Sequence, residues 1–597
     1  MQYAHIILPL KLDWTPIYKG PDAMCRGDWV KVVFAHREYL AVIDSISDTP
    51  NISEEKIEEI ISLETGLRRV SDSELELWHF ASEYYLCSIG EVFKAAYPSP
   101  RIKALKSSLA IKQKQYDKCQ SEVKKIETAI EQCKCKIESK SIERNQCKDG
   151  SKKADKLTYD IEKQSSKLIE LQEKLKASKE QVARLSTSFN STLLASSINY
   201  HSSESTKPEL LISRDRREYY QRVIKETLSR GAQVLLLVPG ISDCISLGST
   251  LSNISTPIFI INSSSTDSQR RVAEEYAQSG QSALFIGTRL AIWLPYSNLA
   301  QIIVEKEHDI LYKQTEPSPR YNARDLAVVL AAIHKAKISL ASAEPSLESR
   351  YNLICGKYIS SEHKSPGQAN SSIELVDISQ ERRKNGMRGA FSCILLDRIN
   401  HTASGKIALI KAWEKADILE EEIHKYIKSV SNIEVYNYNE FRQKSSGEYA
   451  LIAVLQADAL VSSEDFRADE RAMQLVAELL EASPRVLIQS NVAQRFTSSR
   501  DYSELLRERQ LFHFPPFSRH IDILLKDPRQ GEKHAKELCR LLGAVILSTN
   551  NEITRLRLSL ERSADIKNKK REVLSILKTY ELQNKYYGHI VIDVDPQ

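Results

Sequence analysis

Cysteine has the clearest capacity for chemistry in this chain, because a thiolate can bind a metal or form a disulfide. The ten cysteines are spread along 597 residues, at Cys25, Cys87, Cys119, Cys133, Cys135, Cys147, Cys244, Cys355, Cys393 and Cys539. The closest pair, Cys133 and Cys135, is separated by one residue, whereas zinc ribbons use C-x2-C pairs. We therefore expect neither structural zinc nor a disulfide framework. His5 and His308 have no set of metal ligands around them, and we interpret both as packing or hydrogen-bonding residues.

Composition narrows the classes of protein further. Glycine is scarce, with 19 residues in 597, which disfavours a mechanism built on several glycine-rich phosphate loops. The net charge is only +5, from 84 basic and 79 acidic residues, so the total does not demand a nucleic-acid partner, although local basic segments can still bind one. No stretch approaches the roughly 18 apolar residues of a membrane span, and the first residues lack the basic start of a signal peptide. These features predict a soluble, cytoplasmic protein.

Patterning along the chain predicts an N-terminal domain over residues 1–100. Short alternating segments near residues 4–9, 29–34 and 39–43 are typical of strands, and residues 53–96 have helical spacing.

Residues 101–190 have a different pattern, with apolar or small residues spaced three and four apart on both sides of Lys148-Asp149-Gly150. This pattern predicts an antiparallel coiled-coil hairpin with a turn at the glycine, followed by a Ser/Thr-rich linker over 191–207. We interpret the many Lys and Glu residues between the heptad positions as solvated faces first, and as a surface for DNA or a partner second. The more basic stretch near the base of the first helix comprises Lys103, Lys106, Lys112, Lys114, Lys124 and Lys125.

The rest of the chain alternates short apolar runs with helical stretches over 208–357 and, more weakly, over 358–514. This alternation predicts two parallel sheets covered by helices on both faces. Residues 515–597 combine strand signals with basic helix and predict an α+β C-terminal domain. The predicted fold class is therefore α/β, with two parallel-sheet lobes, a small β-rich N-terminal domain and a coiled-coil hairpin.

One long stretch resembles a known family. It contains Gly287-Thr288-Arg289, Glu305-Lys-Glu-His308, Tyr312-Lys-Gln314 and Arg320–Val328, in that order. This order resembles the PriA family, the primosomal protein N′ of bacterial replication restart. Further matching segments lie on both sides, at Ala4–Pro9, Tyr84–Val92, Ser463–Ala472, Glu508–Pro516 and Asp593–Pro596. The resemblance implies that 1–100 is a DNA-binding-like domain and that 208–357 and 358–514 are helicase-like lobes.

The family's members are ATP-dependent DNA helicases, yet the residues of that chemistry are missing here. A phosphate-binding loop needs glycines, a Lys and a Ser/Thr. Its place falls on Leu210–Arg217, where Arg216 and Arg217 take the Lys and Thr positions. The acidic motif has Glu305 followed by Lys306 in the general-base position, and no glycine or arginine follows Ala477 where the family has its arginine motif.

We therefore expect no catalytic residues and no retained site for ATP or Mg²⁺. The family's zinc ribbon is also missing, because no cysteine lies between Lys406 and Gln489, so we expect no zinc.

The family's first lobe places its G-T-R and aromatic–basic loop near nucleic acid. The matching residues, which we predict to contact DNA by stacking and phosphate pairing, are Thr288, Arg289, Tyr312, Lys313, Arg320, Tyr321 and Arg324. Arg289 and Arg324 could instead be structural ion-pair partners. The family's pocket for a nascent-strand 3′ end lacks its expected residues at Pro16, Ile17 and Ala35.

The favoured hypothesis is a degenerate PriA-like protein that binds branched or single-stranded DNA and primosome or replication-restart proteins, with no membrane association and without ATP hydrolysis or unwinding. One alternative is an active 3′-5′ helicase with a divergent nucleotide site. Another is a coiled-coil scaffold that has lost DNA binding.

Overall fold

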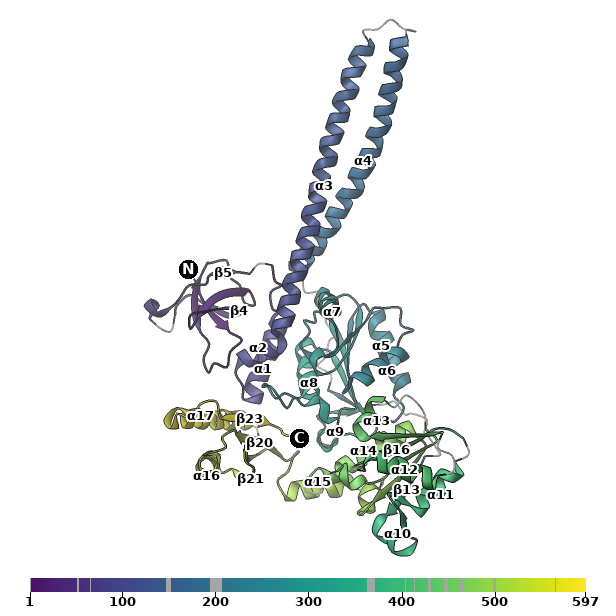
Figure 1. Ribbon diagram of the computed structural model, residues 1–597. Helices are drawn as coiled ribbons and strands as arrows, with labels where there is room; N and C mark the ends of the chain where they lie inside the picture. The colour runs from purple at the N-terminus through teal and green to yellow at the C-terminus, as the bar shows by residue number, and fades with distance from the viewer. Residues whose placement is uncertain are drawn as a thin grey trace.

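The computed structural model describes most of the chain (Figure 1). The described ranges are 2–50, 53–64, 66–145, 152–193, 207–361, 371–402, 404–412, 414–427, 431–444, 449–461, 465–497, 501–563 and 565–597. The predicted turn at Lys148–Gly150 and most of the predicted linker lie outside them, as do the side chains of Lys103, Lys106 and Lys112.

The N-terminal unit is a five-stranded antiparallel sheet followed by two helices. The strand order is β2-β1-β4-β3-β5, with β1 at Gln2–Ile7, β2 at Ile17–Gly20, β3 at Trp29–Phe34, β4 at Arg37–Ser47 and β5 at Ser62–Leu63. Helices α1 (Asp72–Tyr85) and α2 (Ile89–Ala96) both begin at Ser/Glu capping boxes, which satisfy the first backbone N–H groups. The rings of Trp78 and Phe93 lie 5.5 Å apart and join the helices in one core.

Two long helices form an arm that projects from the body (Figure 1). Helix α3 (Ser99–Asn145) and helix α4 (Lys152–Leu193) lie side by side along the arm. Their contact buries Ile130, Cys133 and Leu157, residues at the predicted heptad positions. The base of the arm packs against α7 (Asp267–Ser279). That the arm is a true coiled coil, and where it begins and ends as a domain, stay predictions.

The first lobe is a seven-stranded parallel sheet. Its order is β12-β6-β11-β10-β7-β9-β8, with β6 at Glu209–Ile212, β7 at Gln233–Leu237, β8 at Ile258–Ile261, β9 at Ala283–Gly287, β10 at Leu299–Glu305, β11 at Lys337–Ser342 and β12 at Ile359–Ser360. The central strands are buried along their whole length, as in sheets covered on both faces. Besides α7, the helices of this lobe are α5 (Arg217–Ser229), α6 (Ile241–Thr250), α8 (Ala323–His334) and α9 (Leu347–Ile354).

The second lobe repeats this architecture with five parallel strands. Their order is β13-β19-β18-β16-β17, with β13 at Ser372–Asp377, β16 at Ile407–Lys411, β17 at Ile433–Asn437, β18 at Leu451–Val454 and β19 at Arg485–Ser490. A small hairpin joins β14 (Met387–Arg388) to β15 (Phe391–Ser392). The helices are α10 (Ile378–Lys384), α11 (Cys393–His401), α12 (Ala416–Tyr426), α13 (Tyr438–Lys444), α14 (Ala468–Ala482) and α15 (Tyr502–Leu511). The two parallel sheets confirm the predicted α/β class, whereas the exact domain limits stay predictions.

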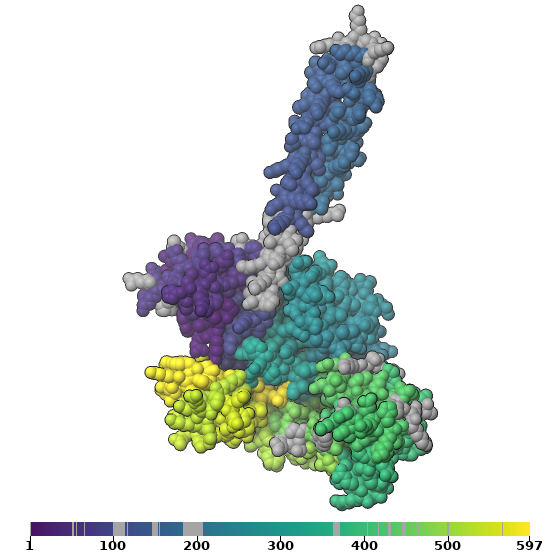
Figure 2. All heavy atoms as spheres, in the orientation of Figure 1, coloured from purple at the N-terminus to yellow at the C-terminus, as the bar shows by residue number. Residues whose placement is uncertain are grey.

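The C-terminal unit is a four-stranded antiparallel sheet with two helices, and it contacts the N-terminal unit (Figures 1 and 2). The order is β21-β22-β20-β23, with β20 at Ser518–Leu525, β21 at Val545–Thr549, β22 at Thr554–Glu561 and β23 at Ile590–Val594. The helices are α16 (Gly531–Leu542) and α17 (Ile566–Asn584). The Tyr84 hydroxyl of α1 donates to Asp595 at 2.7 Å, so the N-terminal unit contacts the segment that follows β23. None of the described helices is long and apolar enough to cross a membrane.

Gly90 provides a test of how α2 packs in the N-terminal unit. A Cβ atom there would lie 2.1 Å from the carbonyl oxygen of Leu10 and 2.2 Å from that of Leu8, both backbone atoms that cannot rotate away. We expect Gly90→Ala to lower the free energy of unfolding by about 2 kcal/mol or more, because the helix or the segment after β1 must move. Gly531→Ala is the control, because its nearest neighbour lies at 3.4 Å and its backbone is unstrained. Urea unfolding measures both variants, and equal stabilities would contradict this packing.

Candidate functional site

Arg216 lies buried where the two lobes meet, beside the cleft that Asp309, Arg442 and Glu478 line. It directly precedes α5, after the loop that leaves β6, and it is 5% exposed. Its Nε donates to one oxygen of Glu305 at 2.9 Å and one of its terminal nitrogens donates to the other oxygen at 2.5 Å. This bidentate geometry is the strongest form of an arginine–carboxylate pair. Glu305 ends β10, so the pair joins the loop after β6 to the carboxyl end of the sheet.

The same guanidinium crosses to the second lobe. The other terminal nitrogen of Arg216 donates to Glu481 of α14 at 2.8 Å. The Tyr220 hydroxyl of α5 also donates to Glu305. One arginine therefore holds carboxylates from both lobes.

A second group of charges lies beside the first and also joins the lobes. Lys306 adopts a left-handed conformation (φ 50°), which directs the chain out of β10, and its amine lies 3.4 Å from Asp243 and 3.6 Å from Glu478 of α14. Arg442 of α13 donates to Glu478 at 3.1 Å and pairs with Asp309 of the first lobe. Cation and carboxylate alternate across the cleft.

Burial and pairing set the ionisation of this cluster. Burial opposes the charged form of Glu305, but Arg216 outweighs it and lowers the pKa of that carboxyl. In the same way, Lys306 and Arg442 hold the pKa of Glu478 at about 2. Burial lowers the pKa of His308 to about 3, so this imidazole is neutral, and its Nδ1 lies 2.7 Å from the Ser342 hydroxyl. Burial raises the pKa of Asp309, although its pairing with Arg442 opposes the shift.

The structure places four of the seven predicted DNA-contacting residues inside the protein. Tyr312 and Tyr321 are 1% and 0% exposed, and the Tyr312 hydroxyl donates to the carbonyl of Leu237 at 3.0 Å. Lys313 pairs with Asp593 at 2.8 Å and donates to the Val594 carbonyl at 2.6 Å. Arg320, 8% exposed, also pairs with Asp593. These side chains anchor the C-terminal strand and the core, and of the four only Arg320 also lines a cavity, one of about 550 Å³ between the N-terminal and C-terminal units.

The other three lie nearer the surface. Arg324, at the start of α8, pairs with Glu307 at 3.1 Å and with Asp325 at 2.8 Å. These pairs are those expected if Arg324 is a structural ion-pair partner and not a DNA contact. Arg289 is partly exposed and donates only weakly to the Leu311 carbonyl, at 3.4 Å. Thr288 lies next to it, also partly exposed. Thr288 and Arg289 thus keep faces through which the predicted DNA contact is possible.

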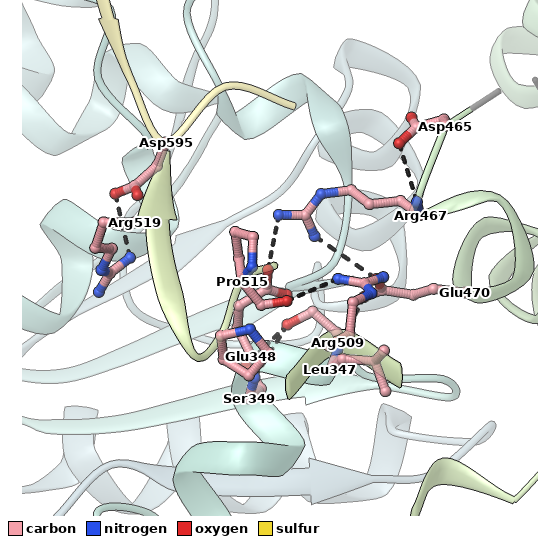
Figure 3. Close-up of polar contacts among 12 residues, drawn as sticks. Leu347, Glu348, Ser349, Asp465, Arg467, Glu470, Arg509, Pro515, Arg519 and Asp595 are labelled. Carbon is pink, nitrogen blue, oxygen red and sulfur yellow. Dashed lines mark hydrogen bonds and ion pairs between the residues drawn. The ribbon is translucent and has the colours of Figure 1, made fainter. Parts of the chain in front are cut away.

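A cavity of about 250 Å³ lies where the two lobes meet the C-terminal unit, beside the ion pairs drawn in Figure 3. Arg467 pairs with Glu348 at 2.7 Å, and Arg509 pairs with Glu470 at 2.8 Å. The backbone N–H of Leu347 donates to the other oxygen of Glu470 at 2.8 Å. The acidic and basic side chains of this junction neutralise one another. Across the described residues, no group of three or more His, Cys, Asp or Glu side chains is placed to hold a metal ion.

Sequence reasoning missed the partners of Arg216 and Lys306. Glu478 and Glu481 are three residues apart, so they share one face of α14. In a predicted helix, this spacing indicates an acidic face that could pair with cations. Nothing in the sequence indicates that this face meets the first lobe.

Comparison with known proteins adds to this geometry. Residues 5–98 match a family model described as the 3′DNA-binding domain (3′BD) of PriA. The chain is 39% identical over 202 residues to the replication restart protein PriA of Haemophilus influenzae, and 36% identical over 185 residues to that of Chlamydia pneumoniae. Over these segments the chain is similar to PriA. These matches cover 32% and 30% of this chain and 26% and 25% of the two relatives, so the chain aligns with about a quarter of their length.

Solved structures also align with parts of this chain, at low scores. RecG bound to a three-way DNA junction matches 52% of this chain and 41% of its own, with 13% identity and a TM-score of 0.31. The DUF1998 helicase MrfA bound to DNA matches 61% of this chain and 59% of its own, with 9% identity and a TM-score of 0.32. At these scores the likenesses carry no argument about the site.

Arg216 provides the first test of the cleft. Arg216→Met leaves Glu305 buried without its ion-pair partner, and we expect a loss of about 3–5 kcal/mol in the free energy of unfolding. The double variant Arg216→Met, Glu305→Gln removes both charges and should recover at least half of that loss. Arg217→Met is the matched control, because its side chain is exposed, and it should change stability by about 0.5 kcal/mol or less. If the single variant and the control are equally stable in urea unfolding, the buried pair is not formed.

His308 provides a pH test. Its pKa in the folded protein is about 3, below the usual ~6.5, so between these values the unfolded chain binds more protons and stability falls as the pH falls. His308→Gln should reduce the pH dependence of unfolding between pH 6.5 and 5, by an amount approaching about 1.4 kcal/mol per pH unit. Urea unfolding of both proteins across this range measures the difference, and parallel pH profiles would show that His308 is not buried as described.

Proposed function

We propose that this PriA-like chain acts in replication restart as a DNA-binding protein that neither hydrolyses ATP nor unwinds DNA. The observation that carries the proposal is the contact of Arg216 with Glu305 of its own lobe and with Glu481 of the second lobe.

This contact lies where the family resemblance places the nucleotide-binding site. The segment β6–loop–α5 has the strand–loop–helix order of a phosphate-binding loop, and Glu305 stands where the resemblance places a Mg²⁺-organising carboxylate. Arg216 lies where the phosphate-binding lysine would be, but its guanidinium is buried against two carboxylates. A nucleotide triphosphate would have to break these pairs and place its own negative charge beside Glu305 and Glu481, which is unfavourable. Lys306 adds a cation where the reaction needs a base.

DNA binding is supported by the match of residues 5–98 to a 3′DNA-binding domain and by the name of the relatives. Trp14 is 59% exposed, and its ring lies 6.1 Å from that of Phe34, so the N-terminal unit presents an aromatic surface on which a base can stack. We propose branched or single-stranded DNA as the ligand and other replication-restart or primosome proteins as partners, in the cytoplasm.

ATP turnover tests the enzymatic part of the proposal. Purified protein with ATP, Mg²⁺ and forked DNA should show no DNA-stimulated phosphate release, and 5 mM Mg·ATP should leave the thermal midpoint unchanged, because a ligand that does not bind cannot stabilise the fold. Turnover at ordinary helicase rates, removed by Glu305→Ala, would instead favour the active-helicase alternative.

Fork binding tests the DNA-binding part separately. We expect affinity for a forked DNA to fall steeply with salt, in proportion to the number of phosphates contacted. Absence of salt-dependent binding would favour the scaffold alternative.

A further inference from the structure

The two long sides of the arm carry different charge. On α3, Lys118, Lys125, Lys136 and Lys140 are separated by seven, eleven and four residues. On α4, Lys156, Lys163, Lys167 and Lys174 are separated by seven, four and seven. Because an α-helix has 3.6 residues per turn, these intervals are close to whole turns, and each set forms one row along its helix.

Contacts between the helices show that the two rows share one side of the arm. The amine of Lys140 lies 2.6 Å from Asp160 of α4. The pKa of Asp160 is lowered first by the hydrogen bond from Lys140, and also by Lys156 and Lys163, so these lysines surround one carboxylate. The four acidic residues interspersed on this side are Glu122, Glu143, Asp160 and Glu170. Eight lysines and four carboxylates therefore make up what we call the basic side.

The opposite side has no such excess of lysine, because glutamates of both helices, Glu162, Glu173 and Glu180 of α4 among them, match its lysines Lys124, Lys134, Lys176 and Lys179. Glu127, Glu131 and Glu138 of α3 lie on it at intervals of four and seven residues, and Glu127 pairs with Lys179 of α4 at 2.8 Å. A hairpin that is only a solvated spacer has no need to sort its charges between two sides.

The basic side is also accessible. Seven of its lysines are exposed and Lys140 is half-buried. Within the described residues, Lys140 and Lys174 are the members of the set with an ion-pair partner, so most of the amines face solvent. The arm leaves the body without contact along most of its length (Figures 1 and 2).

The rows also have a defined length. Lys118 and Lys140 are 22 residues apart, which is about 33 Å along a helix. One turn of B-form DNA is about 34 Å long. A straight, rigid pair of lysine rows suits a rigid duplex, whose phosphates repeat at regular spacing.

We propose that the basic side of the arm binds the sugar–phosphate backbone of double-stranded DNA. This proposal rests on the proposed function, because it gives the duplex part of a fork its own contact, separate from the N-terminal unit. The lysines would recognise the charge and shape of the backbone and would make no contact with the bases.

Two variants of the full-length protein with the same change in net charge test it. The basic-side variant is Lys156→Gln, Lys163→Gln, Lys167→Gln, Lys174→Gln. The control variant, on the opposite side, is Lys124→Gln, Lys134→Gln, Lys176→Gln, Lys179→Gln. Glutamine and lysine have similar helix propensity, so both variants should keep the helical circular dichroism of the parent.

The measurement is the salt dependence of binding to a fork with 25-base-pair arms and to a single strand of equal length. If all four lysines contact phosphates, the basic-side variant should lose about 3.6 from the slope of log K against log salt on the fork, and at least tenfold in affinity at low salt. The control should change affinity less than about threefold, and all three proteins should bind the single strand alike.

Equal losses in the two variants would overturn the proposal and leave the proposed function intact. An equal loss on the single strand would overturn the assignment to duplex DNA. If the parent binds neither probe, the proposed function itself fails.

Discussion

The contact on which the inter-lobe arrangement depends is the pairing of one buried guanidinium with a carboxylate from each lobe. Arg216 is held by Glu305 at the end of β10 and by Glu481 of α14, and neither pair can separate without leaving a buried charge without its ion-pair partner. A buried ion pair adds little to stability compared with packed apolar residues, but breaking it is costly. The contact therefore acts as a constraint on geometry, fixing the distance between the lobes. In a motor that distance has to change with each nucleotide.

A second constraint acts at the other end of the first lobe. Lys313 and Arg320 hold Asp593, so the loop after β10 is fastened to the end of the chain. Asp595 reaches the N-terminal unit through Tyr84, and its pKa is far below the usual range because Arg519 and Lys570 outweigh its burial. The units are thus linked through buried or partly buried charges.

The sequence predicts the fold where the signal is periodic. Heptad spacing predicts the helices of the arm, because each helix is buried along one side only. Short apolar runs predict the strands of both lobes, because those strands are buried on both faces of the sheet. Side-chain partners are different. Arg216 and Glu481 are 265 residues apart, and no local pattern indicates their contact. The mixture of aromatic and basic residues from Tyr312 to Arg324 is a composition that suits nucleic-acid binding. Tertiary packing nevertheless buries Tyr312 and Tyr321, so their rings cannot stack on a base in this structure. Composition indicates which chemistry a segment can perform, and exposure decides whether it does so.

The distance between the lobes tests this account most directly. Fluorophores placed on the exposed faces of α6 and α14, in the full-length protein, would report it by single-molecule energy transfer. The account predicts one narrow distribution that is the same with and without Mg·ATP, and that broadens in the Arg216→Met variant. A distribution that shifts when Mg·ATP is added would contradict it, because the nucleotide would then have displaced Arg216 from the cleft.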